Sequence, residues 1–246
     1  MEKENIIFGI HSVVEALKNQ KDIEKIILLK DSNNFKLKEI EGLAKKNTIK
    51  VSYVPIQKFK KFENLNHQGV IAYASQIEYK NFEETAEKVL SEKEKPVFLL
   101  LDGITDVRNL GAILRTAECT GVDAIVLPKS GSAQVNSETI KTSAGAAFNL
   151  NICKVDHLKD AIFYLKSSGV KIVSVTEKTN LSIYDSNLNE SIGIIMGSEG
   201  VGIQPSILKL TDEKAKLPML GNIESLNVSV ACGAVLYESL RQRLVS

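Results

Sequence analysis

The sequence predicts an α/β protein with a small N-terminal domain and a larger second domain. Short apolar runs alternate with helical patterns along most of the 246 residues, which is typical of this fold class. Charge divides the chain as well: residues 1–75 carry thirteen Lys and nine acids, net +4, and the remainder carries 18 Lys plus Arg and 21 acids, net −3. The composition, 43% hydrophobic and 25% charged, is that of a globular protein.

The first domain is expected to cover residues 1–76. Its apolar patterns alternate between strand and helix periods, which indicates a compact α/β module. A strand or turn leading into a helix is expected at 6–17, strands at 23–30, 49–55 and 69–75, and a helix at 36–46. The charged, glycine-free segment 77–95 predicts a helical linker.

The second domain, residues 96–246, is expected to contain a parallel sheet covered on both faces. Such sheets arise when strands alternate with helices, as the helical pattern at 158–167 indicates. Ligands of these sheets bind beyond the carboxyl ends of the strands. Strands are expected at 97–104, 124–127, 151–155, 171–176 and 192–197.

Membrane, secreted and metal-binding proteins are disfavoured by the sequence. No apolar run approaches the roughly 18 residues of a membrane-spanning helix, and the first ten residues lack the apolar core of a signal peptide. The three cysteines are widely spaced and form no C-x-x-C pair. We therefore expect a soluble cytoplasmic protein that needs no metal.

A first polar pattern lies on the helix expected after residue 109. Apolar residues at 110, 113, 114 and 117 form one stripe, and Asn109 stands where a cap is expected. Arg115 and Glu118 lie on another side, where they either form a surface pair or bind a ligand. The chain has 27 Lys but four Arg, two of them at Arg108 and Arg115, and this favours phosphate binding by the guanidinium.

A second pattern is the run "IGIIMGSEGVGI" at 192–203, in which a buried strand leads into a glycine-rich loop. The loop matches neither G-x-G-x-x-G nor the P-loop, and Glu199 would repel a pyrophosphate. Two interpretations stay open: a tight turn that needs glycine, or a loop that holds a neutral or cationic small molecule.

A third pattern, "LPMLGNIESLNVSVACGAVLYESL" at 217–240, predicts a helix rich in small residues. Ser225 or Asn227 is expected to cap it. Small residues also allow a second backbone to approach closely. Alone, this pattern indicates a buried, capped helix.

A basic stripe occurs in the first domain, where Lys45 to Lys61 includes six Lys and no acid. Tyr53 and Phe59 lie within it and would offer stacking surfaces to bases. The stripe is either a phosphate-binding surface, with Lys58, Lys60 and Lys61 as candidates, or a solvated face.

Together and in this order, the three patterns resemble the SpoU family of RNA ribose 2′-O-methyltransferases. The matching runs are "NLGAILRTA", "MGSEGVG" and "LPMLGNIESLNVSVA", with further likeness in "KTSAGAAFNL" and "HQGVIA". The chain most resembles the branch that methylates a guanosine of 23S ribosomal RNA. It departs from the family at Val107, where proline is usual.

The resemblance implies a SPOUT-type parallel sheet with a C-terminal trefoil knot, an N-terminal RNA-binding domain and a homodimer whose active sites combine both chains. It implies S-adenosyl-L-methionine as the methyl donor and RNA, either 23S rRNA or a large-subunit precursor, as substrate. The implied cofactor contacts are Thr176, Gly197, Leu217 and Leu226. The implied nucleotide-positioning and catalytic residues are Asn109, Arg115, Glu199 and Asn227, with Ser225 contacting RNA or bracing its loop.

Alternatives remain at this stage. A tRNA ribose methyltransferase of the same family is one, although that branch typically lacks so complete an N-terminal domain. A non-catalytic RNA-binding protein is another, although pure binding would not require all four polar residues together. An oxidoreductase that binds a dinucleotide is disfavoured by the absence of G-x-G-x-x-G.

Overall fold

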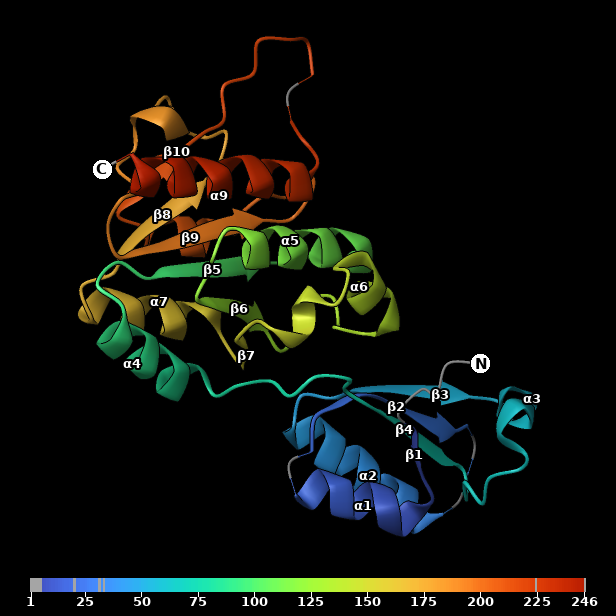
Figure 1. The fold of residues 1–246 in the computed structure, drawn as a ribbon. Coiled ribbons are helices and arrows are strands. Elements are labelled where there is room, and N and C mark those ends of the chain that lie inside the picture. Colours follow the sequence, from blue (N-terminus) through green and yellow to red (C-terminus); the bar gives the residue numbers. More distant parts are fainter. Residues whose placement is uncertain (1–5, 20, 31, 33, 224, 246) are drawn as a thin grey trace. The chain divides into compact units, whose positions relative to one another are not determined.

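A computed structural model describes residues 6–19, 21–30, 32, 34–223 and 225–245 of the chain. The chain divides into two compact units, Met1–Glu78 and Tyr79–Ser246 (Figure 1). Both units are α/β, as predicted. Among the helices described, none is both long enough and apolar enough to span a bilayer.

The first unit is built on a four-stranded mixed sheet in the order β1-β4-β2-β3. Strands β2 and β3 are parallel, and β4 runs antiparallel to β1 and β2. Helices α1 and α2 bury their apolar stripes against one face, and the short α3–η1 segment covers part of the other. The elements are β1 (Ile6–Phe8), α1 (Ile10–Lys18), β2 (Ile23–Leu29), α2 (Phe35–Lys46), β3 (Lys50–Val54), α3 (Ile56–Phe59), η1 (Lys60–Phe62) and β4 (Val70–Ala74).

The basic stripe of the first unit does not form one surface. Tyr53 lies opposite Leu28, whose side chain belongs to the core beneath the helices. Phe59 is 2% exposed and packs against Phe62 and His67 on the other face. The expectation that Phe59 stacks on RNA bases is therefore wrong, because its ring closes a small core instead.

The second unit is built on a six-stranded parallel sheet in the order β10-β8-β9-β5-β6-β7. The five predicted strands are confirmed. The sixth, β10, was missed because three residues reading Glu-Lys-Ala carry no apolar pattern. The strands are β5 (Val97–Asp102), β6 (Ala124–Pro128), β7 (Ile152–Val155), β8 (Lys171–Val175), β9 (Ile192–Gly197) and β10 (Glu213–Ala215).

Helices cover both faces of this sheet (Figure 1). Helices α5 and α9 pack together on one face, with α6 against α5, whereas α4 and α7 lie on the other. These helices and the short ones are α4 (Phe82–Glu92), α5 (Val107–Cys119), α6 (Ser137–Thr142), η2 (Ala146–Phe148), α7 (Leu158–Ser167), η3 (Ile183–Asp185), α8 (Pro205–Leu208) and α9 (Val228–Leu244).

The segment 77–95, expected as a helical linker, contains α4, and this helix packs into the second unit. Phe82, Ala86 and Val89 are buried in the core that α7 and the sheet share. Their spacing of four and three residues places them on one helix face, which the surrounding charges obscured in the sequence.

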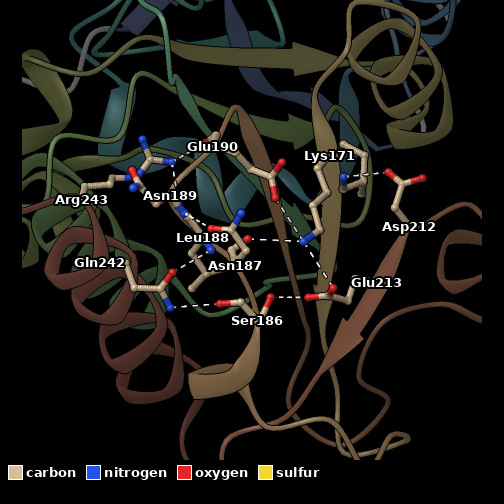
Figure 2. Close-up of polar contacts among 11 residues, drawn as sticks. Lys171, Ser186, Asn187, Leu188, Asn189, Glu190, Asp212, Glu213, Gln242 and Arg243 are labelled. Carbon is tan, nitrogen blue, oxygen red and sulfur yellow. Dashed lines mark hydrogen bonds and ion pairs between the residues drawn. The ribbon is translucent and has the colours of Figure 1, made fainter. Parts of the chain in front are cut away.

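The C-terminal end of α9 is bonded to the segment that precedes β9 (Figure 2). The Arg243 guanidinium donates to the carbonyl oxygens of Leu188 (2.9 Å) and Glu190 (2.6 Å). The Gln242 amide donates to the carbonyl of Ser186 (3.0 Å) and accepts from the backbone N–H of Leu188 (2.8 Å). These bonds satisfy backbone groups of an irregular segment and fix where α9 ends.

The contact between α5 and α6 requires glycine at position 111. A Cβ there would lie 2.6 Å from Cβ of Thr142 and 2.9 Å from the carbonyl oxygen of Thr139. We expect Gly111→Ala to lower the free energy of unfolding of the second unit by about 1–3 kcal/mol, because α5 and α6 must separate.

The matched control is Gly42→Ala in α2, where a Cβ would meet no atom within 4 Å. This change should stabilise the first unit by roughly 0.5–1 kcal/mol, since alanine favours helix. Denaturant unfolding followed by hydrogen exchange of each unit measures both effects. Equal stability of the Gly111→Ala variant and the wild type would contradict the close packing.

Candidate active site

Three adjacent strands end where the cofactor contacts were expected. Thr176 follows β8, Gly197 ends β9 and Leu217 lies two residues after β10. The backbone N–H of Thr176 donates to the carbonyl of Ala215 at 2.9 Å, so the strand ends continue in register. The fold therefore brings Thr176, Gly197 and Leu217 to one edge of the sheet, the edge at which parallel sheets bind ligands.

The glycine-rich loop after β9 is a tight turn closed by backbone hydrogen bonds. The N–H groups of Ser198 and Gly202 donate to each other's carbonyls at 3.2 and 3.0 Å. Gly200 and Gly202 have φ of 85° and 70°, a conformation that favours glycine. A Cβ on Gly197 would lie 2.3 Å from the backbone of Gly202, so the strand end must approach the loop without a side chain.

This turn presents Glu199 to two helix N-termini. One carboxylate oxygen of Glu199 accepts from the Asn109 side-chain amide at 3.3 Å and from the Asn227 side-chain amide at 2.5 Å. It also accepts from the backbone N–H of Val228 at 3.4 Å. The Asn227 amide donates in addition to the Asn109 carbonyl oxygen at 2.9 Å. Three of the four predicted catalytic residues therefore form one hydrogen-bonded cluster.

Asn227 also caps α9, and so the structure selects it from the two predicted candidates, Ser225 and Asn227. Its side-chain oxygen accepts from the backbone N–H groups of Ser229 (3.0 Å) and Val230 (3.4 Å). The amide group of the same side chain remains for Glu199 and Asn109. Ser225 is exposed two residues earlier and is not the cap.

The cap of α5 differs from the prediction. Asp106, not Asn109, is the N-cap, and its carboxylate accepts from the N–H groups of Arg108 (2.8 Å) and Asn109 (2.9 Å). Helix α5 therefore begins two residues before Asn109. The prediction that Asn109 caps α5 is wrong. Because Asp106 is the cap, the side-chain amide of Asn109 is available for the cluster.

Arg115 lies apart from this cluster within one chain. It is six residues from Asn109 on α5, about 9 Å along the helix axis, and about a third of a turn away around it. Its side chain is exposed and forms no hydrogen bond or ion pair with any residue that the structure describes, Glu118 included. Arg108, by contrast, is paired to Glu138 of α6 at 2.8 Å.

Leu226 lies one residue before Asn227, in the segment between β10 and α9. Several apolar side chains of this segment are exposed: Met219, Leu220, Ile223 and Leu226 itself. Apolar groups exposed together are typical of surfaces that bind a ligand or a second protein.

The sequence interpretation missed two aspartates near the site: Asp102, which binds the end of the glycine-rich loop, and Asp106, which caps α5. Asp102 ends β5 and is buried; its carboxylate accepts from the Gln204 backbone N–H at 2.7 Å and from its side-chain amide at 2.9 Å. An acid directly after the apolar run 97–101 was the available signal. For Asp106, the signal was an aspartate placed before the apolar stripe.

One thiol of α9, Cys232, is buried. Burial raises the pKa of the Cys232 thiol to about 12, so this group stays protonated and unreactive. The described residues contain no group of three or more His, Cys, Asp or Glu arranged to hold a metal ion.

We expect Glu199→Ala to loosen the glycine-rich loop and the start of α9 without unfolding the protein. The carboxylate joins these two segments, yet Asn227 would still cap the helix. Amide exchange at 198–202 and 225–230 should rise, while the free energy of unfolding should change by at most about 1 kcal/mol, the usual value of an anion at a helix N-terminus. Glu118→Ala, on the exposed side of α5, is the control and should leave both segments unchanged.

Comparison with known proteins now identifies the family. Residues 96–237 match the SpoU rRNA Methylase family, and residues 6–80 match the domain described as RNA 2′-O ribose methyltransferase substrate binding. The 23S rRNA (guanosine-2′-O-)-methyltransferase RlmB of Xanthomonas campestris is 36% identical over 247 residues, which cover 99% of each chain.

Solved structures agree on the fold. The SpoU methyltransferase AviRb from Streptomyces viridochromogenes, in complex with AdoMet, has a TM-score of 0.62 and 19% identity and covers 98% of this chain and 91% of its own. The A. aeolicus TrmH/SpoU tRNA modifying enzyme has a TM-score of 0.57 and 28% identity, but covers 67% of this chain and 85% of its own. The chain belongs to the SpoU rRNA methylase family: it is an RNA ribose 2′-O-methyltransferase with a substrate-binding domain at its N-terminal end.

Proposed function

We propose that this enzyme transfers a methyl group from S-adenosyl-L-methionine to the ribose 2′-hydroxyl of a guanosine in 23S rRNA or a large-subunit precursor. The observation that carries the proposal is the Asn109–Glu199–Asn227 cluster, which lies where the carboxyl end of β9 meets two helix N-termini. The 23S rRNA relative supports the substrate, because its similarity extends over both units.

The edge of the sheet at which β8, β9 and β10 end is suited to binding S-adenosylmethionine. Thr176, Gly197 and Leu217 would hold it largely through backbone groups, and Leu226 would cover its apolar parts. Glu199 is negative and so compatible with a cationic sulfonium, whereas it disfavours a phosphorylated cofactor. The cofactor supplies a methyl group that is already activated; the protein has to align the hydroxyl with it.

In this proposal, Asn109, Glu199 and Asn227 position the nucleotide, and Arg115 acts on the reacting ribose. Arginine keeps its proton, so the guanidinium does not serve as a base. It binds the neighbouring phosphate through paired N–H groups and stabilises the negative charge that develops on the 2′-oxygen.

Because Arg115 lies apart from the cluster within one chain, we infer a homodimer in which Arg115 of one chain serves the site of its partner. The outward side of α9 supports a second chain there: Val230 and Tyr237 are more than half exposed, and Gly233 and Ala234 lie between them. The first part of α9, residues 228–237, carries no charged residue, and a helix segment that is apolar on all sides is typically covered on all sides.

We also propose that the chain from β10 to α9 closes the trefoil knot of this family. The bonds at both ends of α9, to residues 186–190 and to Glu199, support this, because they hold the helix against segments before and after β9. An experimental structure with bound cofactor would test the chain path.

The first unit would bind the RNA in the cytoplasm, where ribosomal subunits are assembled. Lys58 and Lys60 are exposed on α3–η1 and remain candidates for phosphate contacts, together with Lys61. Ser225, exposed beside the cluster, is proposed to contact RNA or to brace its loop.

A tRNA ribose is the second candidate substrate. The tRNA modifying enzyme of A. aeolicus covers 67% of this chain and the 23S rRNA relative covers 99%, but a Staphylococcus epidermidis relative named as a putative tRNA/rRNA methyltransferase covers 97%. A non-catalytic RNA-binding protein is disfavoured, since binding alone would not require the polar cluster. Incubation with labelled cofactor and separate unmodified tRNA and rRNA, followed by mapping of the 2′-O-methyl group, distinguishes these functions.

We expect Arg115→Ala to reduce methyl transfer about 10²–10³-fold while fold and cofactor affinity are retained, because an electrostatic contact in the transition state is lost. Arg115→Lys should recover only part of the activity, since an ammonium cannot make the paired contact. Full activity of the Arg115→Ala variant would remove this residue from the mechanism.

Mixing Arg115→Ala with Glu199→Ala chains tests the shared site. In a two-fold dimer, each mixed pair would regain one intact site, so random exchange should restore about a quarter of wild-type activity. If both residues acted within one chain, mixing would restore nothing.

The K58Q/K60Q variant tests the lysines of α3–η1 and should weaken RNA binding. The slope of the logarithm of the binding constant against the logarithm of the salt concentration should become smaller in magnitude by about 1.4, the value for two phosphates of a single strand. An unchanged slope would show that these lysines form a solvated face.

A further inference from the structure

Two lysine ammonium groups meet at one tyrosine in the first unit. The Lys25 Nζ lies 4.3 Å from the centre of the Tyr73 ring. The Lys61 Nζ donates to the Tyr73 hydroxyl at 3.4 Å and lies 4.6 Å from the centre of the Phe62 ring. Tyr73 is 9% exposed; Lys25 lies over the face of its ring, and Lys61 contacts its hydroxyl.

A third lysine extends this group along the sheet. Lys50 of β3 lies opposite Lys25 of β2, and Lys25 lies opposite Tyr73 of β4. Residues opposite each other on neighbouring strands point to the same face, about 4.8 Å apart. Tyr73 belongs to the apolar cluster on the face away from α1 and α2, so all three lysines are on that face.

The three lysines have no carboxylate partner among the residues that the structure describes. Positive charges held close together repel one another, and an anion placed between them removes this cost. The Tyr73 hydroxyl accepts a hydrogen bond from Lys61, which leaves its own O–H available to donate to an anion. The positions and charges of these groups therefore indicate an anion-binding site beside the Tyr73 ring.

We propose that Lys25, Lys61 and Tyr73 bind one phosphate of the RNA substrate and that Lys50 binds the next phosphate along the sheet. This inference rests on the proposed function, that the chain methylates RNA. RNA is the occupant favoured by the charges and by the match of residues 6–80 to a substrate-binding domain, which contains all four residues. Of these lysines, only Lys61 and Lys50 fall in the basic stripe of the sequence.

The test compares two triple variants of the full chain with equal loss of charge. K25Q/K50Q/K61Q removes the proposed site, whereas K38Q/K45Q/K46Q removes three exposed lysines of α2, on the other face of the sheet. Binding to an unmodified 23S rRNA transcript is measured over a range of salt concentrations. The first variant should lower the log–log slope by about 1.4, the value for two phosphates, and the second should leave it unchanged.

Two further variants separate charge from packing. K25R/K50R/K61R keeps the charge and is expected to bind RNA as the wild type does. Tyr73→Phe removes only the hydroxyl and should weaken binding about two- to tenfold, the range for one hydrogen bond. Thermal unfolding of each variant confirms that it is folded.

The outcomes distinguish this inference from the proposed function. Equal slopes for the two glutamine triples, in a wild-type enzyme that methylates rRNA, would overturn the phosphate site and leave the function in place. A wild-type chain that methylates neither rRNA nor tRNA, but whose RNA binding depends on the first triple alone, would overturn the function and leave the site.

Discussion

Helix α9 is bonded at both ends to segments that flank strand β9, and the candidate active site depends on this arrangement. Arg243 and Gln242 bind residues 186–190 before the strand, and Glu199 after the strand binds Asn227 and Val228. The 17-residue helix is about 25 Å long and the six-residue strand is about 20 Å long. Because the two lengths are similar, short segments on either side of the strand reach the two ends of the helix. The rigid strand therefore fixes where the helix begins.

The polar side chains of the site cap two helices and also form the hydrogen-bonded cluster. Asp106 caps α5, which leaves the Asn109 amide for Glu199, and Asn227 uses its oxygen for the cap of α9 and its amide for the cluster. No proton-transferring histidine is part of this cluster. Such a site suits methyl transfer from an activated donor, where alignment and charge stabilisation contribute more to rate than acid–base catalysis.

The two units differ in the charge that each places on its functional surface. In the first, Lys25 and Lys61 contact Tyr73 on one face of a mixed sheet, and Lys50 lies opposite Lys25. In the second, the loop at the carboxyl edge carries Glu199, and α5 carries Arg115, whose side chain is exposed. The lysine group around Tyr73 and the Glu199 cluster thus lie on separate elements of the chain.

The sequence by itself determined the α/β class, five of the six strands of the second unit, a cap of α9 at Ser225 or Asn227, and the family, because these depend on local periodicity and on ordered motifs. Only the tertiary structure decided what depends on contacts between distant residues. It assigned the α5 cap to Asp106, buried Phe59, packed α4 into the second unit and separated Arg115 from the cluster. It also placed Lys50 beside Lys25 through the pairing of β2 with β3, and it brought Lys61 of η1 to Tyr73, because these contacts join residues far apart in the chain.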